Sequence, residues 1–279
     1  METHDLQDRA VRFRALHTGA VLVLPNAWDA VSAAVIAAAG AAAIATTSAG
    51  LSWALGTHDA QGLDRADLVA ATARIVLAVT VPVTADIEGG YGPDPRDVAE
   101  TVRAIVDVGA VGINLEDAPG RAGDPLHSAA GQARRIAAAR ATADTAGIDL
   151  FINARTDVYL RGVGDPAGRL AKVQERARVY ADAGADGLFV PGVVDVDLVA
   201  ELAAGPLPLN VMAGPGAPPV AELARAGAAR VSVGSAIAQA AYQLGARSAA
   251  ELLKTGTYEA MSDALDYGGL NELLAAPAY

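Results

Sequence analysis

Two acidic side chains, Asp86 and Glu88, end a short apolar run and are followed at once by glycines, in the segment Val83-Thr-Ala-Asp-Ile-Glu-Gly-Gly-Tyr-Gly92. The apolar run predicts a strand, in which side chains alternate between the two faces. Asp86 and Glu88 would therefore point the same way, where two like charges repel unless a proton or a cation lies between them. Hard oxygen ligands of this kind favour Mg²⁺ or Mn²⁺ over zinc. The competing interpretation is an acidic turn that binds nothing.

The charge balance limits the partners of such a site. The chain has 279 residues and a net charge of −11, which argues against nucleic acid or an anionic membrane as a partner. A small anionic substrate remains compatible, because a bound cation and one arginine reverse the sign of the charge locally.

The residue types that are missing limit the chemistry. The chain contains no cysteine, which excludes disulfides, a thiolate nucleophile and cysteine-ligated metals. Its two lysines, Lys172 and Lys254, fall in helical stretches away from any predicted strand end, so a Schiff-base aldolase is not expected. An enolate would instead be stabilised by the metal, by Arg155 and by backbone N–H groups. This chemistry suits a 2-oxo acid, whose carboxylate and keto oxygens chelate Mg²⁺.

No targeting or membrane segment is predicted. The first residues lack the basic start and apolar segment of a signal peptide. The uncharged run 30–57 is long enough to span a bilayer, but it is dominated by alanine and interrupted at Gly40. A buried helix followed by a buried strand explains this run better, and we expect a cytoplasmic protein.

Along the chain, apolar β-like runs alternate with helix-period segments rich in Ala, Arg and Glu. Hydrophobic residues make up 52% of the chain and aromatic residues only 4%, as in helices layered on a parallel sheet. Several helical segments end in Gly-Ala, and glycine just after a helix is a common stop signal. Eight such strands predict a (β/α)₈ barrel, with one domain over residues 1–279. The predicted strands are 21–25, 42–46, 81–85, 112–115, 150–154, 187–190, 207–212 and 230–233; an N-terminal helix lies within 1–20, and a helical tail occupies 249–279.

In such a barrel, catalytic groups lie at the carboxyl ends of the strands. Charged residues concentrate there on predicted strands three to five, which supports a metal site. The polar residues at the predicted strand ends and in the loop after strand two are His58, Asp59, Asp86, Glu88, Asn114, Glu116, Asp117, Asn153, Arg155, Asp157 and Asn210.

With these motifs the chain resembles the phosphoenolpyruvate mutase/isocitrate lyase superfamily. The similarity extends over nearly the whole chain, and the Asp-x-Glu-Gly-Gly-Tyr-Gly and Asn-Leu-Glu-Asp motifs are its most specific parts. The matching segments are Pro25-Asn-Ala-Trp-Asp-Ala-Val-Ser-Ala33, Thr46-Thr-Ser-Ala-Gly50, Leu55-Gly-Thr-His-Asp59, Ala85-Asp-Ile-Glu-Gly-Gly-Tyr-Gly92, Gly112-Ile-Asn-Leu-Glu-Asp117 and Asn153-Ala-Arg-Thr-Asp157.

The resemblance implies a role for each matching residue. Asp86 would bind Mg²⁺ directly, while Glu88 and Glu116 would hold its water ligands. The backbone at Thr47 and Ser48 would bind the carboxylate or phosphonyl end of the substrate. Asp59, beside the reacting atoms, and Arg155, paired with the anionic group of the substrate, would be catalytic as well as substrate-binding, and Asn210 is the remaining expected substrate contact. Members of the superfamily are usually tetramers, built as dimers of dimers, that exchange the last barrel helix between subunits, which would explain the helical tail.

One departure from the superfamily's pattern affects the expected reaction. The lyases carry a Lys-Lys-Cys-Gly-His or Lys-Arg-Cys-Gly-His loop after strand four, whose cysteine is the acid/base. Here this loop is Pro119-Gly-Arg-Ala-Gly-Asp-Pro-Leu-His-Ser128, so ordinary isocitrate or methylisocitrate cleavage is not expected. His127 is the candidate replacement, because imidazole titrates near neutrality. A solvated loop histidine is the competing interpretation for His127, as a loop cap is for Asp59 and a salt bridge to Asp157 or Glu116 is for Arg155.

The sequence leaves several functions open. The first is a Mg²⁺-dependent lyase or decarboxylase that cleaves a C–C bond of a small 2-oxo or 2-hydroxy dicarboxylic acid. The second is C–P chemistry, of the phosphoenolpyruvate mutase or phosphonopyruvate hydrolase type, in the same pocket. A phosphosugar-binding barrel using Gly214-Pro-Gly216 and Val233-Gly-Ser235 would leave the acidic cluster without a task. A catalytically silent barrel is the last alternative.

Overall fold

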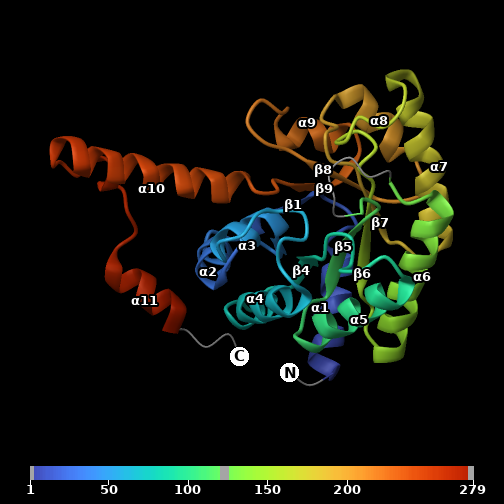
Figure 1. Cartoon of the computed structure of the whole chain (residues 1–279), viewed down its shortest axis with the longest axis horizontal. Coiled ribbons are helices and arrows are strands. Elements are labelled where there is room, and N and C mark those ends of the chain that lie inside the picture. The colour runs from blue at the N-terminus through green and yellow to red at the C-terminus, as the bar shows by residue number, and fades with distance from the viewer. Residues whose placement is uncertain (1–2, 120–125, 276–279) are drawn as a thin grey trace.

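The computed structural model of the chain describes residues 3–119 and 126–275. All strand pairs of its sheet are parallel, and helices surround the sheet (Figure 1). The strands are β1 (Leu22–Leu24), β2 (Asn26–Ala27), β3 (Ile44–Thr46), β4 (Val83–Asp86), β5 (Gly112–Glu116), β6 (Phe151–Arg155), β7 (Gly187–Phe189), β8 (Leu209–Met212) and β9 (Ala228–Ser232).

The sheet closes through its first strand, which is divided at Pro25. Proline has no N–H for the ladder, so the strand is interrupted there. The first half, β1, pairs with β9, and the second half, β2, pairs with β3. The result is an eight-stranded α/β barrel of the TIM type, as the sequence predicts.

Helices connect the strands and cover the barrel. Aspartates begin several of them: Asp29, Asp64 and Asp195 each accept a backbone N–H of the first turn, the usual role of an N-cap. The helices are α1 (Thr3–Ala15), α2 (Ala30–Ala38), α3 (Ser48–Ala54), α4 (Arg65–Leu77), α5 (Pro95–Asp107), α6 (Ala129–Ala146), α7 (Arg169–Asp182), α8 (Val196–Ala203), α9 (Val220–Arg225), α10 (Ala236–Thr255) and α11 (Tyr267–Ala275), with 3₁₀ turns η1 (Pro166–Gly168) and η2 (Glu259–Met261).

The amino-terminal helix α1 closes the floor of the barrel. Phe13 of this helix is fully buried and meets Phe151 edge to face, and the ring of His17 stacks on Phe151 with centroids 3.8 Å apart. Gly112 makes room for this packing, because a Cβ there would lie 2.7 Å from the Phe13 ring. Phe13 and Phe151 therefore help to plug the floor of the barrel.

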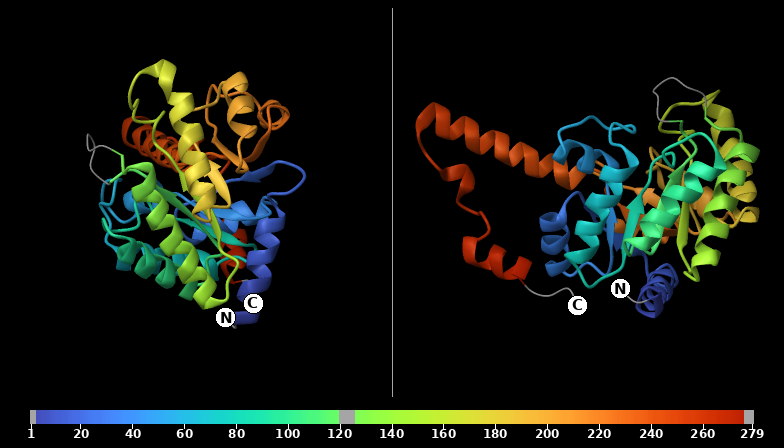
Figure 2. Two further views of the ribbon diagram at one scale, coloured as in Figure 1. Left: turned by 90° about the vertical axis from the view of Figure 1, so that its right-hand side faces the viewer. Right: turned by 60° about the horizontal axis from the view of Figure 1, so that its bottom comes forward.

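Beyond β9 the chain leaves the barrel. Figures 1 and 2 show α10 running away from the sheet, with α11 returning below it toward α2. The predicted tail begins at residue 249, whereas the helix of the structure starts earlier, at Ala236, and continues without a break to Thr255. The prediction placed this boundary wrongly, because Gly245 does not interrupt the helix.

Within the described residues, no helix is long and apolar enough to cross a membrane. The uncharged run from residue 30 contains α2 and β3, as predicted, and also the short helix α3, which the sequence analysis did not anticipate.

Candidate active site

Three charged residues occupy the last positions of three neighbouring strands. Asp86 ends β4, Glu116 ends β5 and Arg155 ends β6. Parallel pairing brings these ends to one rim, and Glu116 lies directly opposite Arg155 in the register. The side chains of Asp86 and Glu116 are buried, so the predicted acidic cluster is assembled at the carboxyl end of the barrel.

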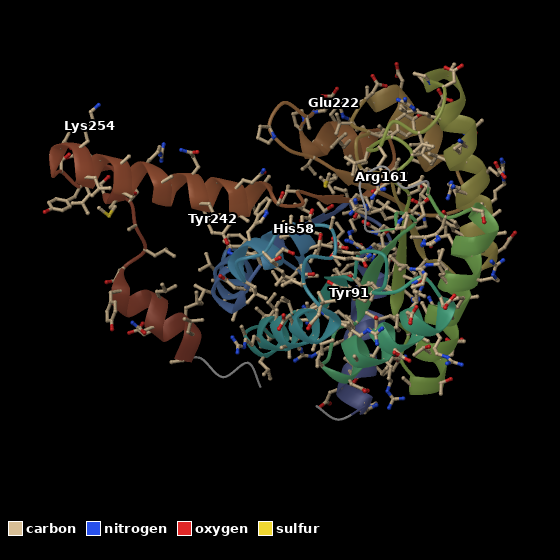
Figure 3. All side chains as sticks on the ribbon, in the orientation of Figure 1. His58, Tyr91, Arg161, Glu222, Tyr242 and Lys254 are labelled. Atoms are coloured by element: carbon tan, nitrogen blue, oxygen red, sulfur yellow. The ribbon has the colours of Figure 1, made fainter. Side chains whose placement is uncertain are left out.

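Glu88 joins this cluster from the loop that follows β4. The Gln61 N–H donates to its Oε2 at 2.6 Å, and the Tyr91 hydroxyl donates to its Oε1 at 3.1 Å. Figure 3 labels Tyr91 and also His58, which lies in the same loop as Gln61. Glu88, Tyr91 and Gln61 all have positive φ, an uncommon conformation for residues with a side chain. The sequence analysis did not identify Gln61 or Tyr91 as partners of Glu88, although Tyr91 lies within the quoted motif.

The acids of the cluster raise one another's pKa values. Burial, followed by the charge of Asp86, raises the pKa of Glu88 to about 7. Burial also raises the pKa of Glu116 to about 8, with Asp157, Asp86 and Glu88 adding to it against the lowering effect of Arg155. The pKa of Asp86 is raised as well, chiefly by burial. Buried carboxylates that disfavour one another's charge in this way are suited to a cation.

The donor set fits a hard cation that is held mostly through water. Among residues 3–119 and 126–275, no three acidic or histidine side chains are grouped closely enough to hold a metal ion directly. The expectation of one direct ligand, Asp86, with Glu88 and Glu116 contacting the metal's water ligands, requires no such group and stays a prediction. Mg²⁺ commonly keeps several waters and uses only one or two protein carboxylates.

Arg155 is held by two carboxylates. Its Nε and Nη2 donate to Asp157 at 2.7 and 3.0 Å, and its Nη1 lies 2.8 Å from Glu116 Oε2. The salt bridges of the competing interpretation are therefore both present. They do not remove Arg155 from the rim, because Glu116 belongs to the acidic cluster itself.

The predicted substrate contacts on the other strands differ in their surroundings. The Thr47 N–H donates to the Ala27 carbonyl at 3.1 Å, so this amide is already part of the strand ladder. Ser48 begins α3, and its side chain hydrogen-bonds to Asp86, which lowers the pKa of that carboxyl in opposition to burial. Asn210 is buried on β8 and donates to Ser232 Oγ at 3.0 Å.

Asp59 and His127, two of the expected catalytic residues, lie at different places. Asp59 is exposed in the loop after α3, and its charge raises the pKa values of Asp86 and Glu88, so it lies beside the cluster. His127 is half-buried, and the charges that act on its pKa belong to Arg135, Asp117 and Arg176 rather than to the cluster acids. Of the two, Asp59 is the one that the structure brings near Asp86.

Arg135 supports the glycine turn from behind and was not identified from the sequence. This buried side chain on α6 donates to the carbonyls of Gly92 and Pro93 at 2.9 and 2.6 Å, and also to that of Gly89. A helical arginine looks like a surface residue in sequence, so no local pattern could have revealed this contact.

The positions of the lysines agree with the exclusion of Schiff-base chemistry. Figure 3 shows Lys254 at the far end of α10, away from the barrel, and Lys172 lies in α7.

Comparison with known proteins gives a consistent match. The family model for phosphoenolpyruvate phosphomutase covers residues 13–253. An uncharacterized protein of Mycobacterium tuberculosis is 37% identical over 237 residues, 84% of this chain and 82% of its own length. A provisionally named lyase/mutase of Burkholderia cenocepacia J2315 has a TM-score of 0.91 and 39% identity, with 98% of each chain covered.

A second solved structure is an oxaloacetate acetylhydrolase in complex with its product oxalate. It has a TM-score of 0.85 and 26% identity, and the match covers 96% of this chain and 94% of that one. Because the family model spans most of the chain, the protein belongs to the phosphoenolpyruvate phosphomutase family, within the phosphoenolpyruvate mutase/isocitrate lyase superfamily.

Proposed function

We propose that the protein is a Mg²⁺-dependent enzyme that cleaves a C–C bond of a small 2-oxo or 2-hydroxy dicarboxylic acid through an enolate. The observation that carries this proposal is the buried cluster of Asp86, Glu88 and Glu116 beside Arg155 at the barrel rim. A site with three acids and one arginine suits an anionic substrate only when a cation reverses the local charge. The 26% identical oxaloacetate acetylhydrolase, which holds oxalate, supports a substrate of this class.

The protein residues divide the work between binding and charge stabilisation. Arg155 would pair with a substrate carboxylate through Nη1, the atom that faces Glu116 in the structure. Ser48 and Asn210 would fix the substrate's other polar atoms. For a 2-hydroxy acid, Asp59 would accept the hydroxyl proton as the carbonyl forms and the C–C bond breaks, and the bonding electron pair would become the enolate. A proton would then return to the enolate carbon, with His127 as the alternative acid/base. Bound Mg²⁺, with Mn²⁺ as an alternative, would stabilise the negative charge on the substrate's oxygens.

C–P chemistry is the second candidate function. The family model that matches the chain is named for phosphoenolpyruvate phosphomutase. Cleavage of a C–P bond next to a keto group would leave an enolate, which the same divalent cation would stabilise. The same residues would serve phosphonopyruvate, with Arg155 and the Ser48 region facing its two anionic ends.

Product analysis separates these candidates. The purified protein with Mg²⁺ is assayed against oxaloacetate, phosphonopyruvate and a 2-methylmalate-type acid, with an Asp86→Asn control for metal-catalysed background decay. Pyruvate or oxalate formed from oxaloacetate supports C–C cleavage, and phosphate released from phosphonopyruvate supports C–P cleavage. Absence of turnover on all three acids, together with absence of binding, would reject an enolate enzyme of this class.

We further propose that the protein is an oligomer in which α10 and α11 are exchanged with a second subunit. Because α10 leaves the barrel, the outer face of β1 is left uncovered, and Val23 there is 48% exposed. An apolar groove of about 600 Å³, lined by Val21, Val23, Ile36 and Ile237 among others, lies at this place. The helices that leave the barrel carry exposed Leu and Tyr side chains, which suit such a groove.

A further inference from the structure

One arginine on α7 connects several parts of the catalytic rim. Arg176 Nη1 donates to Asp117 Oδ2 at 2.8 Å and to the Tyr180 hydroxyl at 2.7 Å, and its Nη2 donates to the His127 carbonyl at 2.9 Å. The Tyr180 hydroxyl in turn donates to Asp117 Oδ2 at 2.8 Å. Asp117 is 0% exposed and Arg176 8% exposed, so this group of three side chains is shielded from water.

The second oxygen of Asp117 continues the connection toward Arg155. Asp117 Oδ1 accepts the Asp157 N–H at 3.0 Å. The carboxylate of Asp157 holds Arg155 through Nε and Nη2, and Arg161 Nε lies 3.6 Å from the same carboxylate. Because Asp157 holds two of the three guanidinium nitrogens of Arg155, the position of the Asp157 backbone helps to set where Nη1 points, together with Glu116, which lies 2.8 Å from Nη1.

The same group also fixes the backbone of His127. The His127 N–H donates to the Asp117 carbonyl at 2.9 Å, and the His127 carbonyl accepts from Arg176. Both polar backbone groups of this residue are therefore held by the Asp117–Arg176 pair. The Arg176 guanidinium, together with the Asp117 carboxylate that it binds, thus connects the end of β5, the end of β6 and the start of α6.

We propose that Arg176, with Asp117 and Tyr180, is a positioning residue that sets the direction of the Arg155 guanidinium and the place of His127. The proposal rests on the proposed function, in which Arg155 binds the substrate carboxylate. Buried ion pairs contribute little net stability, because desolvation offsets the attraction between the charges. Their value here is geometric, since a binding group must be held in its productive direction by its neighbours.

The barrel contains a matched group that has no contact with the rim. Arg140 on α6 donates to the Asp186 carboxylate and to the Gly184 carbonyl, as Arg176 does to Asp117 and His127. Asp186 also accepts the N–H of Ile152, at the amino-terminal end of β6. Both arginines join a helix to an aspartate and a backbone carbonyl, but Asp186 is only partly buried and is also bound by Arg14 at 2.7 Å. Arg140 lies at the opposite end of the strands from the acidic cluster.

The experiment compares Arg176→Met, Arg176→Lys and Tyr180→Phe with Arg140→Met in the full chain. Three quantities are measured: the thermal midpoint, the Kd of Mg²⁺ alone, and the Kd of oxalate in saturating Mg²⁺, which serves as a planar mimic of the enolate. Amide hydrogen exchange of His127, Asp157 and Ile152 reports the backbone positions without reference to activity.

We expect Arg176→Met to raise the Kd of oxalate at least tenfold and to change the Kd of Mg²⁺ less than threefold. Amide hydrogen exchange at His127 and Asp157 should become faster. Tyr180→Phe should raise the Kd of oxalate two- to fivefold, and the effect of Arg176→Lys should lie between those of Tyr180→Phe and Arg176→Met. Arg140→Met lowers the thermal midpoint and speeds exchange at Ile152, but leaves the Kd of oxalate within twofold. If Arg176→Met does not fold, the lysine and phenylalanine variants decide by the same criteria.

Two results would overturn the inference, and they differ from failure of the proposed function. Oxalate affinity that is unchanged in the Arg176 and Tyr180 variants would show that the group is only structural. Equal losses of oxalate affinity in Arg176→Met and Arg140→Met would show the same, because the effect would then follow stability alone. A wild-type protein that binds no oxalate in Mg²⁺ would instead reject the proposed function, and the positioning role with it.

Discussion

The Asp86 carboxylate differs from that of Glu116 in the kind of partner it has. Glu116 is paired with the Arg155 guanidinium, whereas Asp86 accepts from two uncharged groups, the Glu88 N–H at 3.2 Å and the Ser48 side chain. A carboxylate whose hydrogen-bond partners carry no charge is the better candidate for direct contact with a cation. That Asp86 is the direct metal ligand stays a prediction.

A prediction at the residue scale concerns His17, which lies at the barrel floor. Burial, and next the charge of Arg230, lowers its pKa from 6.5 to about 4. Between pH 4 and pH 6.5, the unfolded chain therefore binds a proton at His17 that the folded protein does not. The contribution of His17 to the free energy of unfolding is fully present above pH 6.5 and is lost as the pH falls toward 4. The loss reaches about 3 kcal/mol when both transitions are passed. Urea unfolding from pH 7.5 to 4 measures it.

His17→Phe is the control for this prediction, because it keeps the stacking on Phe151 and removes the titrating group. The variant should lose about 3 kcal/mol less than the wild type over the same pH interval. An identical pH dependence in both proteins would show that other groups cause it.

At the scale of the elements, most of the barrel was predictable and the contacts between its elements were not. All eight strands were found, because each is a short apolar run and several follow a helix that ends at a glycine; Gly40, Gly109, Gly184 and Gly227 indeed have positive φ after their helices. The division of the first strand at Pro25 was missed, although proline chemistry accounts for it.

The candidate site was likewise only partly predictable from the sequence. Its acids were found because strand register follows from the chain itself. Arg135, Arg176 and Tyr180 were missed because they lie on helices, where a polar side chain at helical spacing looks the same whether it is solvated or buried against a strand end. Apart from the contact between Arg176 and Tyr180 themselves, their partners are 42 or more residues away in the chain, so only the fold identifies these contacts.

The packing of α1 into the barrel floor gives a prediction for Gly112. Alanine there would place its Cβ 2.7 Å from both the Phe13 ring and Thr84 Oγ1. Overpacking of this kind costs about 1–3 kcal/mol of unfolding free energy, measured by urea unfolding. Gly168→Ala is the control, since nothing lies within 4 Å of the added methyl group, and its effect should be neutral or slightly stabilising. Equal effects of the two substitutions would contradict this account of the floor.

At the scale of the whole molecule, the apolar side chains of α10 and α11 need a cover. Leu253 on α10 is 87% exposed, and the groove beside β1 is open. If a second subunit covers both, Leu253→Glu should lower the mass measured by light scattering, because burial of a charge at an interface is costly. Leu77→Glu on α4, a leucine that is 62% exposed outside this region, should leave the mass unchanged. A wild-type protein with the mass of one chain would contradict the exchange of helices.

The central claim is that a divalent cation held by Asp86 creates the binding site for a 2-oxo acid. Isothermal titration calorimetry of wild type and Asp86→Asn with Mg²⁺, and then with oxalate, tests it most directly. We predict that the wild type binds oxalate only when Mg²⁺ is present, and that Asp86→Asn weakens Mg²⁺ by at least about tenfold, or 1.4 kcal/mol, and removes oxalate binding. Equal binding of Mg²⁺ and oxalate by both proteins would contradict the claim.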